Sequence, residues 1–382
     1  MNRPLVLGIE TSCDDTACAV LDGDGRVLSS IVSSQLAVHA PYGGVVPEIA
    51  SREHLANWLP VSEEALAAAG VRTAELDAVA ATRGPGLVGA LLVGLALGKA
   101  LAFALGRPFY AVHHLEGHLY SPFLYPATGA AARAAAPPPP TFQGLVLSGG
   151  HSSLFAVRDG RIETLGETRD DAFGEVFDKV GKRLGLPYPQ GPRVDELAER
   201  GDPSAFRLPV PGCGDTLDFS YSGLKSQTLT EIERLERRLG PLGAAGAGAT
   251  EGGAAGQGAA GQDATAAAPE LPQPALDLLA AFRAAAVAQV IDRLERLVRR
   301  PPGSGGHGAD GPLAVSGGAA ANRLLRRELP AWSARHGREL RLVPLVYAGD
   351  NAAMIAHAAL LRHARGLADD PFAAEAESRI PI

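Results

Sequence analysis

The chain has 382 residues, 46% of them apolar, and a formal net charge of −7. The length indicates more than one domain with a sizeable core, and the charge excludes a uniformly basic nucleic-acid binder without excluding a local basic patch. Its three cysteines form no paired framework, which fits a reducing cytosol, and early acidic residues argue against a signal peptide. We therefore expect a cytoplasmic location.

One sequence pattern occurs twice, at 5–31 and at 145–165. Each copy reads as an apolar strand, a small polar turn, a second strand, an Asp-Gly hairpin turn and a third strand. The repeat predicts a duplicated α/β lobe with a cleft between the copies. The alternative is that two unrelated hairpins match by chance. Small residues in each first turn leave backbone N–H groups free to hold phosphate oxygens.

A strand near 77–82 leads into the apolar run from Gly86 to Leu105, which is long enough to span a bilayer. The run contains Lys99 and small residues such as Gly94 and Gly98, four positions apart. We interpret it as a buried helix with close packing, and we expect no membrane association.

Further strands and helices alternate along the rest of the chain. The order favours α/β sheets of the ribonuclease-H type over a plain Rossmann fold. Three low-complexity segments interrupt it, at 127–140, 240–270 and 301–311; the middle one is expected to be disordered and functionally neutral. The predicted elements are strands at 108–112, 312–316 and 339–345, and helices from His114 and at 170–186, 221–238, 274–299, 319–329 and 350–364.

His114 and His118 lie four positions apart, so a helix places both imidazoles on one face. Such a pair suits two ligands of one metal ion, although buried structural histidines are the alternative. A carboxylate would complete the site, and Asp350, between a strand and a helix, is the candidate. Its other role would be to cap that helix.

A zinc peptidase is the rival class for paired histidines. Its motif has glutamate directly after the first histidine, pointing at the metal-bound water. Here Glu116 comes two positions after His114, about 200° round the helix, so it faces away. A metal-dependent glycoprotein endopeptidase is therefore the alternative and not the preferred function.

Two glycine-containing turns are candidate ligand sites. The turn Ser148-Gly149-Gly150-His151 allows a phosphate to approach the backbone closely. The segment 316–322 follows a strand, and its small residues leave room for a flat ring such as adenine, with Asn322 supplying hydrogen bonds. Tight packing of a helix against a strand would explain this segment equally well.

Charged groups suggest further contacts. Asp171, Glu175 and Asp178 share a helix face that leads into the rigid loop Tyr188–Pro192, and this acidic face would suit ribose hydroxyls or a cation. A basic cluster could follow a nucleic-acid backbone, with Arg52 and His54 lining the same groove, although solvated surfaces are commoner. Its members are Arg323, Arg326, Arg327, Arg335, Arg338 and Arg341.

Taken in order, these motifs resemble the tRNA threonylcarbamoyladenosine transferase family, the TsaD family of bacteria. The resemblance covers nearly the whole chain outside the low-complexity segments. The matching runs are 9–16, 43–48, 83–87, 114–118, 147–151, 177–179, 218–225, 319–323 and 350–352.

The resemblance implies two ribonuclease-H-like lobes of the actin-like and sugar-kinase ATPase superfamily. The first lobe would be 1–112 with the C-terminal part from about 346–382, and the second 113–345. It implies a divalent metal ion, usually iron with zinc as the alternative, on His114, His118 and Asp350. It also implies that ATP, ADP or threonylcarbamoyl-AMP in the cleft contacts Val146, Leu147, Ser148, Gly149, Gly150, Asp178, Gly191, Asp195 and Asn322.

The activity implied is transfer of threonylcarbamoyl from its adenylate to the N6 amine of the adenosine beside the anticodon, in tRNAs that read codons beginning with adenine. A paralogue-like partner subunit and a small ATPase are implied as helpers. Ser152 stands where the family often has threonine, and Ala348-Gly349 where Cys-Thr is common, and neither change removes a proposed ligand. A sugar kinase of the same fold is a third class, which would need a carboxylate base beside a sugar pocket.

Overall fold

The computed structural model describes residues 3–126, 137–210, 212–242, 270–300 and 311–382. The predicted low-complexity segments fall almost entirely outside these residues, including the segment 240–270 for which disorder was expected.

The first sheet has six strands in the order β5-β4-β1-β2-β3-β6. Its antiparallel meander β1-β2-β3 continues through β1 into the parallel strands β4 and β5. Consecutive buried side chains in β1, β2 and β4 show that both faces of the sheet are covered. The strands are β1 (Val6–Glu10), β2 (Asp15–Leu21), β3 (Arg26–Ser34), β4 (Ala78–Gly84), β5 (Phe109–His113) and β6 (Tyr125–Pro126).

The second sheet repeats this topology in the order β11-β10-β7-β8-β9. Strands β7, β8 and β9 form an antiparallel meander, and β10 and β11 add in parallel beside β7. The predicted pair of meanders is therefore confirmed, with the same arrangement of parallel strands next to each. The strands are β7 (Thr141–Leu147), β8 (Ser152–Arg158), β9 (Arg161–Glu167), β10 (Leu313–Ser316) and β11 (Leu340–Leu342).

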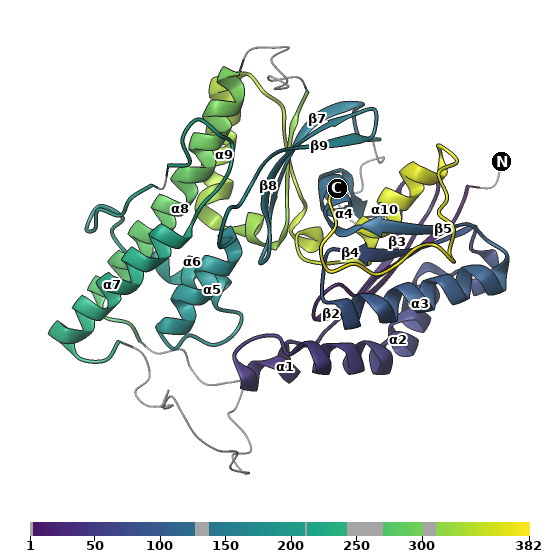
Figure 1. Cartoon of the computed structure of the whole chain (residues 1–382), viewed down its shortest axis with the longest axis horizontal. Coiled ribbons are helices and arrows are strands. Elements are labelled where there is room, and N and C mark those ends of the chain that lie inside the picture. Colours follow the sequence, from purple (N-terminus) through teal and green to yellow (C-terminus); the bar gives the residue numbers. More distant parts are fainter. Residues whose placement is uncertain (1–2, 127–136, 211, 243–269, 301–310) are drawn as a thin grey trace, which may run out of the picture.

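Helices form three layers around the two sheets (Figure 1). α2 (Pro47–Ala69) and α3 (Val88–Leu105) cover the outer face of the first sheet, and we call this sheet with these helices the first lobe. α4 (His114–Tyr120) and α10 (Ala352–His363) lie between the sheets, in a core that joins Val6 to Phe155. The second lobe is the second sheet with its outer helices α5 (Phe173–Arg183), α6 (Gln190–Ala198), α7 (Ser222–Leu239), α8 (Gln273–Arg299) and α9 (Arg323–His336).

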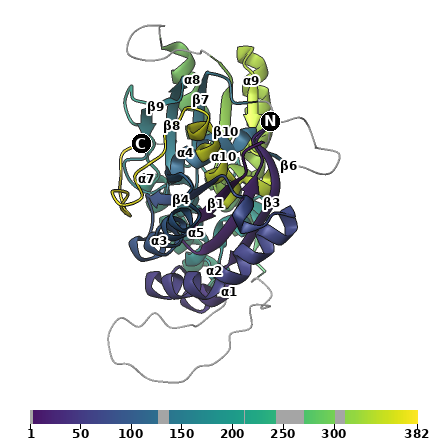
Figure 2. The ribbon, with the colours of Figure 1, turned by 90° about the vertical axis from the view of Figure 1, so that its right-hand side faces the viewer.

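The turned view places α2 and α3, with the short α1 (Leu36–His39), at the end of the molecule away from α8 and α9 (Figure 2). The prediction that His54 lines a groove with the late arginines is wrong. His54 is fully buried, and its Nδ1 lies 2.7 Å from the Thr16 hydroxyl.

The prediction that the run ending at Leu105 is a buried helix is only half right. Gly94 packs so closely on Thr11, the residue after β1, that an added Cβ would lie 2.3 Å from the Thr11 hydroxyl oxygen, so the glycine allows the contact. The opposite face is exposed, with Leu92 at 53% and Phe103 at 71%. α3 and α8 are both long and apolar enough to cross a membrane, yet α8 is mostly buried within the protein.

The loop predicted at Tyr188–Pro192 contains the start of α6. The Asp178 carboxylate accepts a hydrogen bond of 2.6 Å from Gly191 N, which supplies a partner for an N–H group that the first turn of a helix leaves unpaired. This contact lies 13 positions away in the sequence, so the local pattern did not reveal it.

Candidate metal centre and adjoining cavity

Three side chains that could ligate a metal ion meet between the two sheets. α4 begins directly after β5 and places His114 and His118 on one face, and the loop before α10 brings in Asp350. Asp350 Oδ1 lies 3.2 Å from His118 Nε2 and 3.5 Å from His114 Nε2. The potential ligand atoms all lie within 4.8 Å of one another.

The alternative prediction, that Asp350 caps α10, is wrong. The cap is Asn351, whose side-chain oxygen accepts a hydrogen bond of 3.0 Å from Met354 N. The Asp350 carboxylate therefore remains available to a ligand at the edge of the histidine pair.

A buried carboxylate contacts the ring nitrogen of His114 that faces away from Asp350. Glu10, at the end of β1, has its Oε2 3.1 Å from His114 Nδ1 and also accepts a hydrogen bond of 2.6 Å from Thr82 Oγ1. Its other oxygen accepts from Ser12 N at 2.5 Å. A carboxylate on one ring nitrogen leaves the opposite nitrogen free to ligate and fixes the ring orientation, which is the usual second layer of a histidine metal site.

The electrostatics suit a cation. Burial lowers the pKa of His114, but the carboxylates of Asp350 and Glu10 outweigh it and raise the pKa to about 9. Burial lowers the pKa of His118, and His118 Nδ1 is buried with no hydrogen-bond partner. Two imidazoles and one carboxylate fit Fe²⁺ or Zn²⁺ when one or more coordination positions are left open.

Glu116 points away from this cluster, as the helical spacing predicts. Its carboxylate binds the Arg362 guanidinium, with contacts of 2.6 Å and 3.1 Å. The arrangement of a zinc peptidase, with glutamate on the metal-bound water, is thus absent at this residue.

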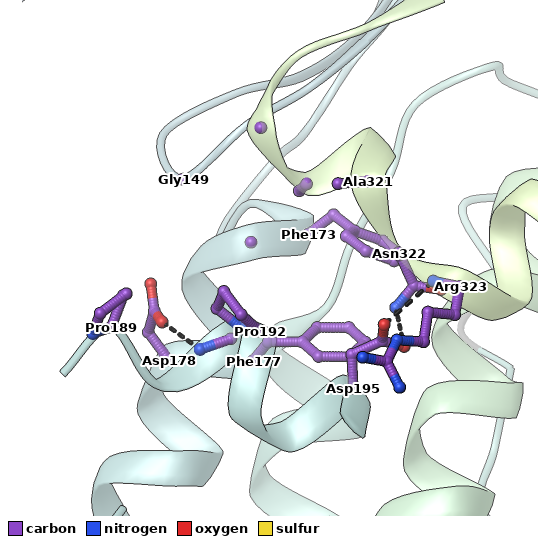
Figure 3. A pocket seen from close by; sticks show the side chains of 14 residues that line it. Gly149, Phe173, Phe177, Asp178, Pro189, Pro192, Asp195, Ala321, Asn322 and Arg323 are labelled. Atoms are coloured by element: carbon purple, nitrogen blue, oxygen red, sulfur yellow. Dashed lines mark hydrogen bonds between the residues drawn. The ribbon is translucent and has the colours of Figure 1, made fainter. Parts of the chain in front are cut away.

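A cavity of about 380 Å³ lies in the second lobe, and Gly149 of the turn 148–151 is part of its lining (Figure 3). Phe173 and Phe177 of α5 form one wall, and small residues after β10 leave the opposite side open. The expected room for a flat ring is present here, between aromatic and small side chains. The lining includes Gly149, Phe173, Phe177, Asp178, Pro189, Gly191, Pro192, Asp195, Gly318, Ala319, Ala321, Asn322 and Arg323.

The polar end of this cavity is organised by Asp195. Its two oxygens accept from Asn322 Nδ2 at 2.8 Å and from Arg323 N at 3.0 Å (Figure 3). Arg283 adds a contact of 3.2 Å. Asn322 also caps α9 by accepting from Leu325 N. The cap therefore holds the Asn322 side chain in place at the cavity edge.

The turn 148–151 connects the cavity to the metal cluster. Ser148 N donates to His151 O at 2.8 Å, and the His151 ring centroid lies 6.5 Å from that of His114. Gly149 lines the cavity, whereas the side chains of Val146 and Leu147 are buried in the core. Only the backbone of these two residues could face a ligand.

Most of the charged side chains predicted to face ligands are paired with other groups of the protein, several of them at its surface. Asp171 accepts from Lys179, Lys225 and Ser222, so the acidic face is largely neutralised. Five of the six arginines of the predicted basic cluster likewise contact other residues of the protein, whereas Arg323 lines the cavity. Arg326 donates to Val343 O, Arg327 pairs with Glu199, Arg335 lies near Glu295, Arg338 donates to Gln143 and Arg341 to Tyr125.

Sequence reasoning missed the aromatic wall formed by Phe173 and Phe177 and the role of Glu10 behind His114. The position of Glu10 at the end of a buried strand was the available signal, because polar side chains at strand ends meet at one edge of a sheet.

The fold defines a class of two-lobed α/β proteins. HypF from T. kodakarensis is similar to this chain over 96% of it and 48% of HypF, with 15% identity and a TM-score of 0.55. A full-length HypF structure in a phosphate- and nucleotide-bound form covers 94% of the chain with a TM-score of 0.54, 55% of its own length and 13% identity. These likenesses, with the repeated sheet topology, place the chain among the actin-like folds.

The chain belongs to the tRNA N6-adenosine threonylcarbamoyltransferase family, TsaD, whose model matches residues 26–357. Relatives of that name include one from Pelobacter propionicus, 46% identical over 92% of this chain and 90% of its own length. Another, from Syntrophobacter fumaroxidans, is 45% identical over 98% of this chain and 99% of its own. The protein is therefore an acyltransferase that modifies tRNA.

Proposed function

We propose that the protein transfers a threonylcarbamoyl group from threonylcarbamoyl-AMP to the N6 amine of the adenosine beside the anticodon, in tRNAs reading codons that begin with adenine. One observation carries the donor assignment: the turn 148–151 joins a ring-sized cavity to the His114, His118 and Asp350 cluster. The donor consists of an adenosine, a phosphate and a reactive carbonyl in this order, which matches the order of cavity, turn and cluster.

The cavity beside Phe173 and Asn322 would hold the adenosine, and the backbone of Gly149 and Gly150 would hold the phosphate. Neither glycine has a heavy atom within 4 Å of the position of an added Cβ, so a phosphate can approach the backbone there. The carbamoyl end then lies toward the imidazoles.

His114, His118 and Asp350 would hold one divalent metal ion, with Fe²⁺ favoured over Zn²⁺. When bound, it would polarise a carbonyl oxygen as a Lewis acid. Glu10 fixes the His114 ring, and burial of both histidines keeps bulk water from the carbonyl.

The donor is a mixed anhydride, so AMP is a good leaving group and no covalent nucleophile is required. The adenosine N6 attacks the carbamoyl carbon, the new C–N bond forms as the bond to the phosphate oxygen breaks, and the amine proton passes to solvent. The protein contributes mainly by positioning the two reactants.

We propose a cytoplasmic enzyme that works with a partner subunit and a small ATPase. The first lobe offers an exposed apolar surface, with Leu55 and Leu59 one turn apart on α2 and Val88 and Leu92 one turn apart on α3. A surface of this kind is typical of a protein–protein interface.

The test is a transfer assay with threonylcarbamoyl-AMP, unmodified tRNA and the helper proteins. Digestion of the tRNA and mass spectrometry of its nucleosides should reveal threonylcarbamoyladenosine. Cleavage of a glycoprotein, lost on chelation, without any modified nucleoside would instead support the peptidase.

A further inference from the structure

A second cavity, of about 560 Å³, lies between the lobes and adjoins the first. The two cavities share Gly149 and Asp178. We call the second one the interlobe cavity. It is lined by the loop Gly43–Val45 of the first lobe and by Gly149, Gly150, Glu175, Asp178, Lys179, Lys182, Tyr188 and Gln190 of the second.

Among the described residues, the ammonium group of Lys182 in the interlobe cavity forms no ion pair. Lys179 pairs with Asp171 and with Glu175 at 2.8 Å, and Asp178 accepts from Gly191 N. Lys182 Nζ instead donates to the Gly43 carbonyl at 3.3 Å, and no carboxylate of the described residues pairs with it. An exposed ammonium group held at the cavity by a single carbonyl can bind an anion there.

The backbone around Lys182 is open. Gly44, Gly149 and Gly150 have no heavy atom within 4 Å of an added Cβ, so a bulky oxyanion can approach their N–H groups. The second anion would therefore meet the Lys182 ammonium group and the backbone at Gly44 of the first lobe, next to the turn 148–151 that holds the donor phosphate.

Tyr188 supplies an aromatic surface in the same cavity. Its hydroxyl donates to Asp14 Oδ2 at 3.4 Å across the lobes, which fixes the ring. A lysine, glycine turns and an aromatic ring together are the features with which proteins bind single-stranded nucleic acid, by phosphate contact and base stacking.

We propose that the interlobe cavity binds the tRNA nucleotide next to the target adenosine, with its phosphate on Lys182 and its base on Tyr188. This inference rests on the proposed function and extends it to the acceptor. The donor phosphate is assigned to the turn 148–151, so the two anions occupy separate places that meet at Gly149.

The test measures tRNA binding by the full chain with its helper proteins, at several salt concentrations, for the wild type, Lys182→Gln and Lys182→Arg. Lys182→Gln should weaken tRNA binding roughly 3- to 10-fold and reduce the salt slope by about 0.7 to 1. Lys182→Arg should restore both. AMP binding should stay unchanged in all three.

Tyr188→Leu should weaken tRNA binding by about 5-fold or more through lost stacking, whereas Tyr188→Phe should keep most of the binding.

Arg72→Gln is the charge-matched control for Lys182→Gln. Arg72 is highly exposed and follows α2, whose 23 residues span about 34 Å and separate it from the loop Gly43–Val45. It should leave the salt slope unchanged.

The inference is wrong if the wild type modifies tRNA while Lys182→Gln binds tRNA with the wild-type affinity and salt slope. It is also wrong if Lys182→Gln weakens only the donor, or if Arg72→Gln has the same effect as Lys182→Gln. If the wild type fails to modify tRNA at all, the proposed function fails first.

Discussion

His118 Nε2 lies 3.2 Å from Asp350 Oδ1, although 232 positions separate the two residues in the chain. His118 comes from α4 and Asp350 from the loop before α10, the two helices packed between the sheets. The candidate metal site is therefore a product of the contact between α4 and α10, and it depends on the packing of both lobes against these helices.

Substitutions at two neighbouring residues, Asp350 and Asn351, should have separate effects on metal binding and on the cap of α10. Asp350→Asn should abolish stable metal binding, because an amide is a poor substitute for the anionic ligand, and should leave the cap of α10 intact. Asn351→Ala should lower the unfolding free energy by about 1 kcal/mol through loss of the α10 cap and should keep the metal. Elemental analysis and urea unfolding of both variants measure the two effects. Equal metal loss in the two would contradict this division.

Glu10 is predicted to position His114 rather than to react. Glu10→Gln should lower metal affinity about 10- to 100-fold, as removal of a supporting carboxylate usually does. Activity should return at saturating metal, because the ligands themselves remain. A titration against a competing chelator gives the affinity, and a wild-type value would rule out the positioning role.

The first cavity can be filled by enlarging an exposed small residue. Ala321→Leu should weaken AMP binding at least about 10-fold, because the larger side chain occupies the space beside Phe173, and should keep the metal. Ala334→Leu, at an exposed position of α9, is the matched control. Calorimetric titration with AMP distinguishes them, and unaltered binding by Ala321→Leu would place the adenosine elsewhere.

Asp171 should make stability depend on pH. Burial raises its pKa, but hydrogen bonds from Lys179, Lys225 and Ser222 outweigh this and lower it from 3.8 to about 2. Because the folded pKa is depressed, the stabilisation is complete above the unfolded value and is lost as pH falls toward 2.

Asp171→Asn should therefore cost about 1 kcal/mol of unfolding free energy at pH 6, allowing for screening at the exposed Lys179. The cost should shrink between pH 4 and pH 2. Urea unfolding across this range measures it, with Asp215→Asn as an exposed control. A cost independent of pH would show that the ion pairs are not its source.

The sequence predicted the two meanders and the histidine pair, because strand alternation, hairpin turns and the four-residue helix spacing are local patterns. The partner of each arginine was not predictable. Arg327 pairs with Glu199, 128 positions away, and Arg338 contacts Gln143, 195 positions away, so only the packed fold shows that these cations are engaged.

The sequence did not reveal for a different reason that one face of α3 is exposed. The helix is apolar on all sides, so its period does not distinguish the side on β4 from the side bearing Leu92. The contact of Glu10 with His114 joins the end of β1 to the residue that follows β5. It could not be predicted without the sheet order β5-β4-β1.

The most direct test of the account measures transfer to tRNA together with bound metal, for the wild type, for the metal-stripped wild type and for the double variant His114→Ala/His118→Ala. We predict that stripping abolishes formation of threonylcarbamoyladenosine, that added Fe²⁺ or Zn²⁺ restores it in the wild type, and that the double variant neither binds metal nor transfers. Full transfer by the double variant, or by stripped protein held in chelator, would contradict the central claim that these two histidines and Asp350 form the metal centre of the reaction.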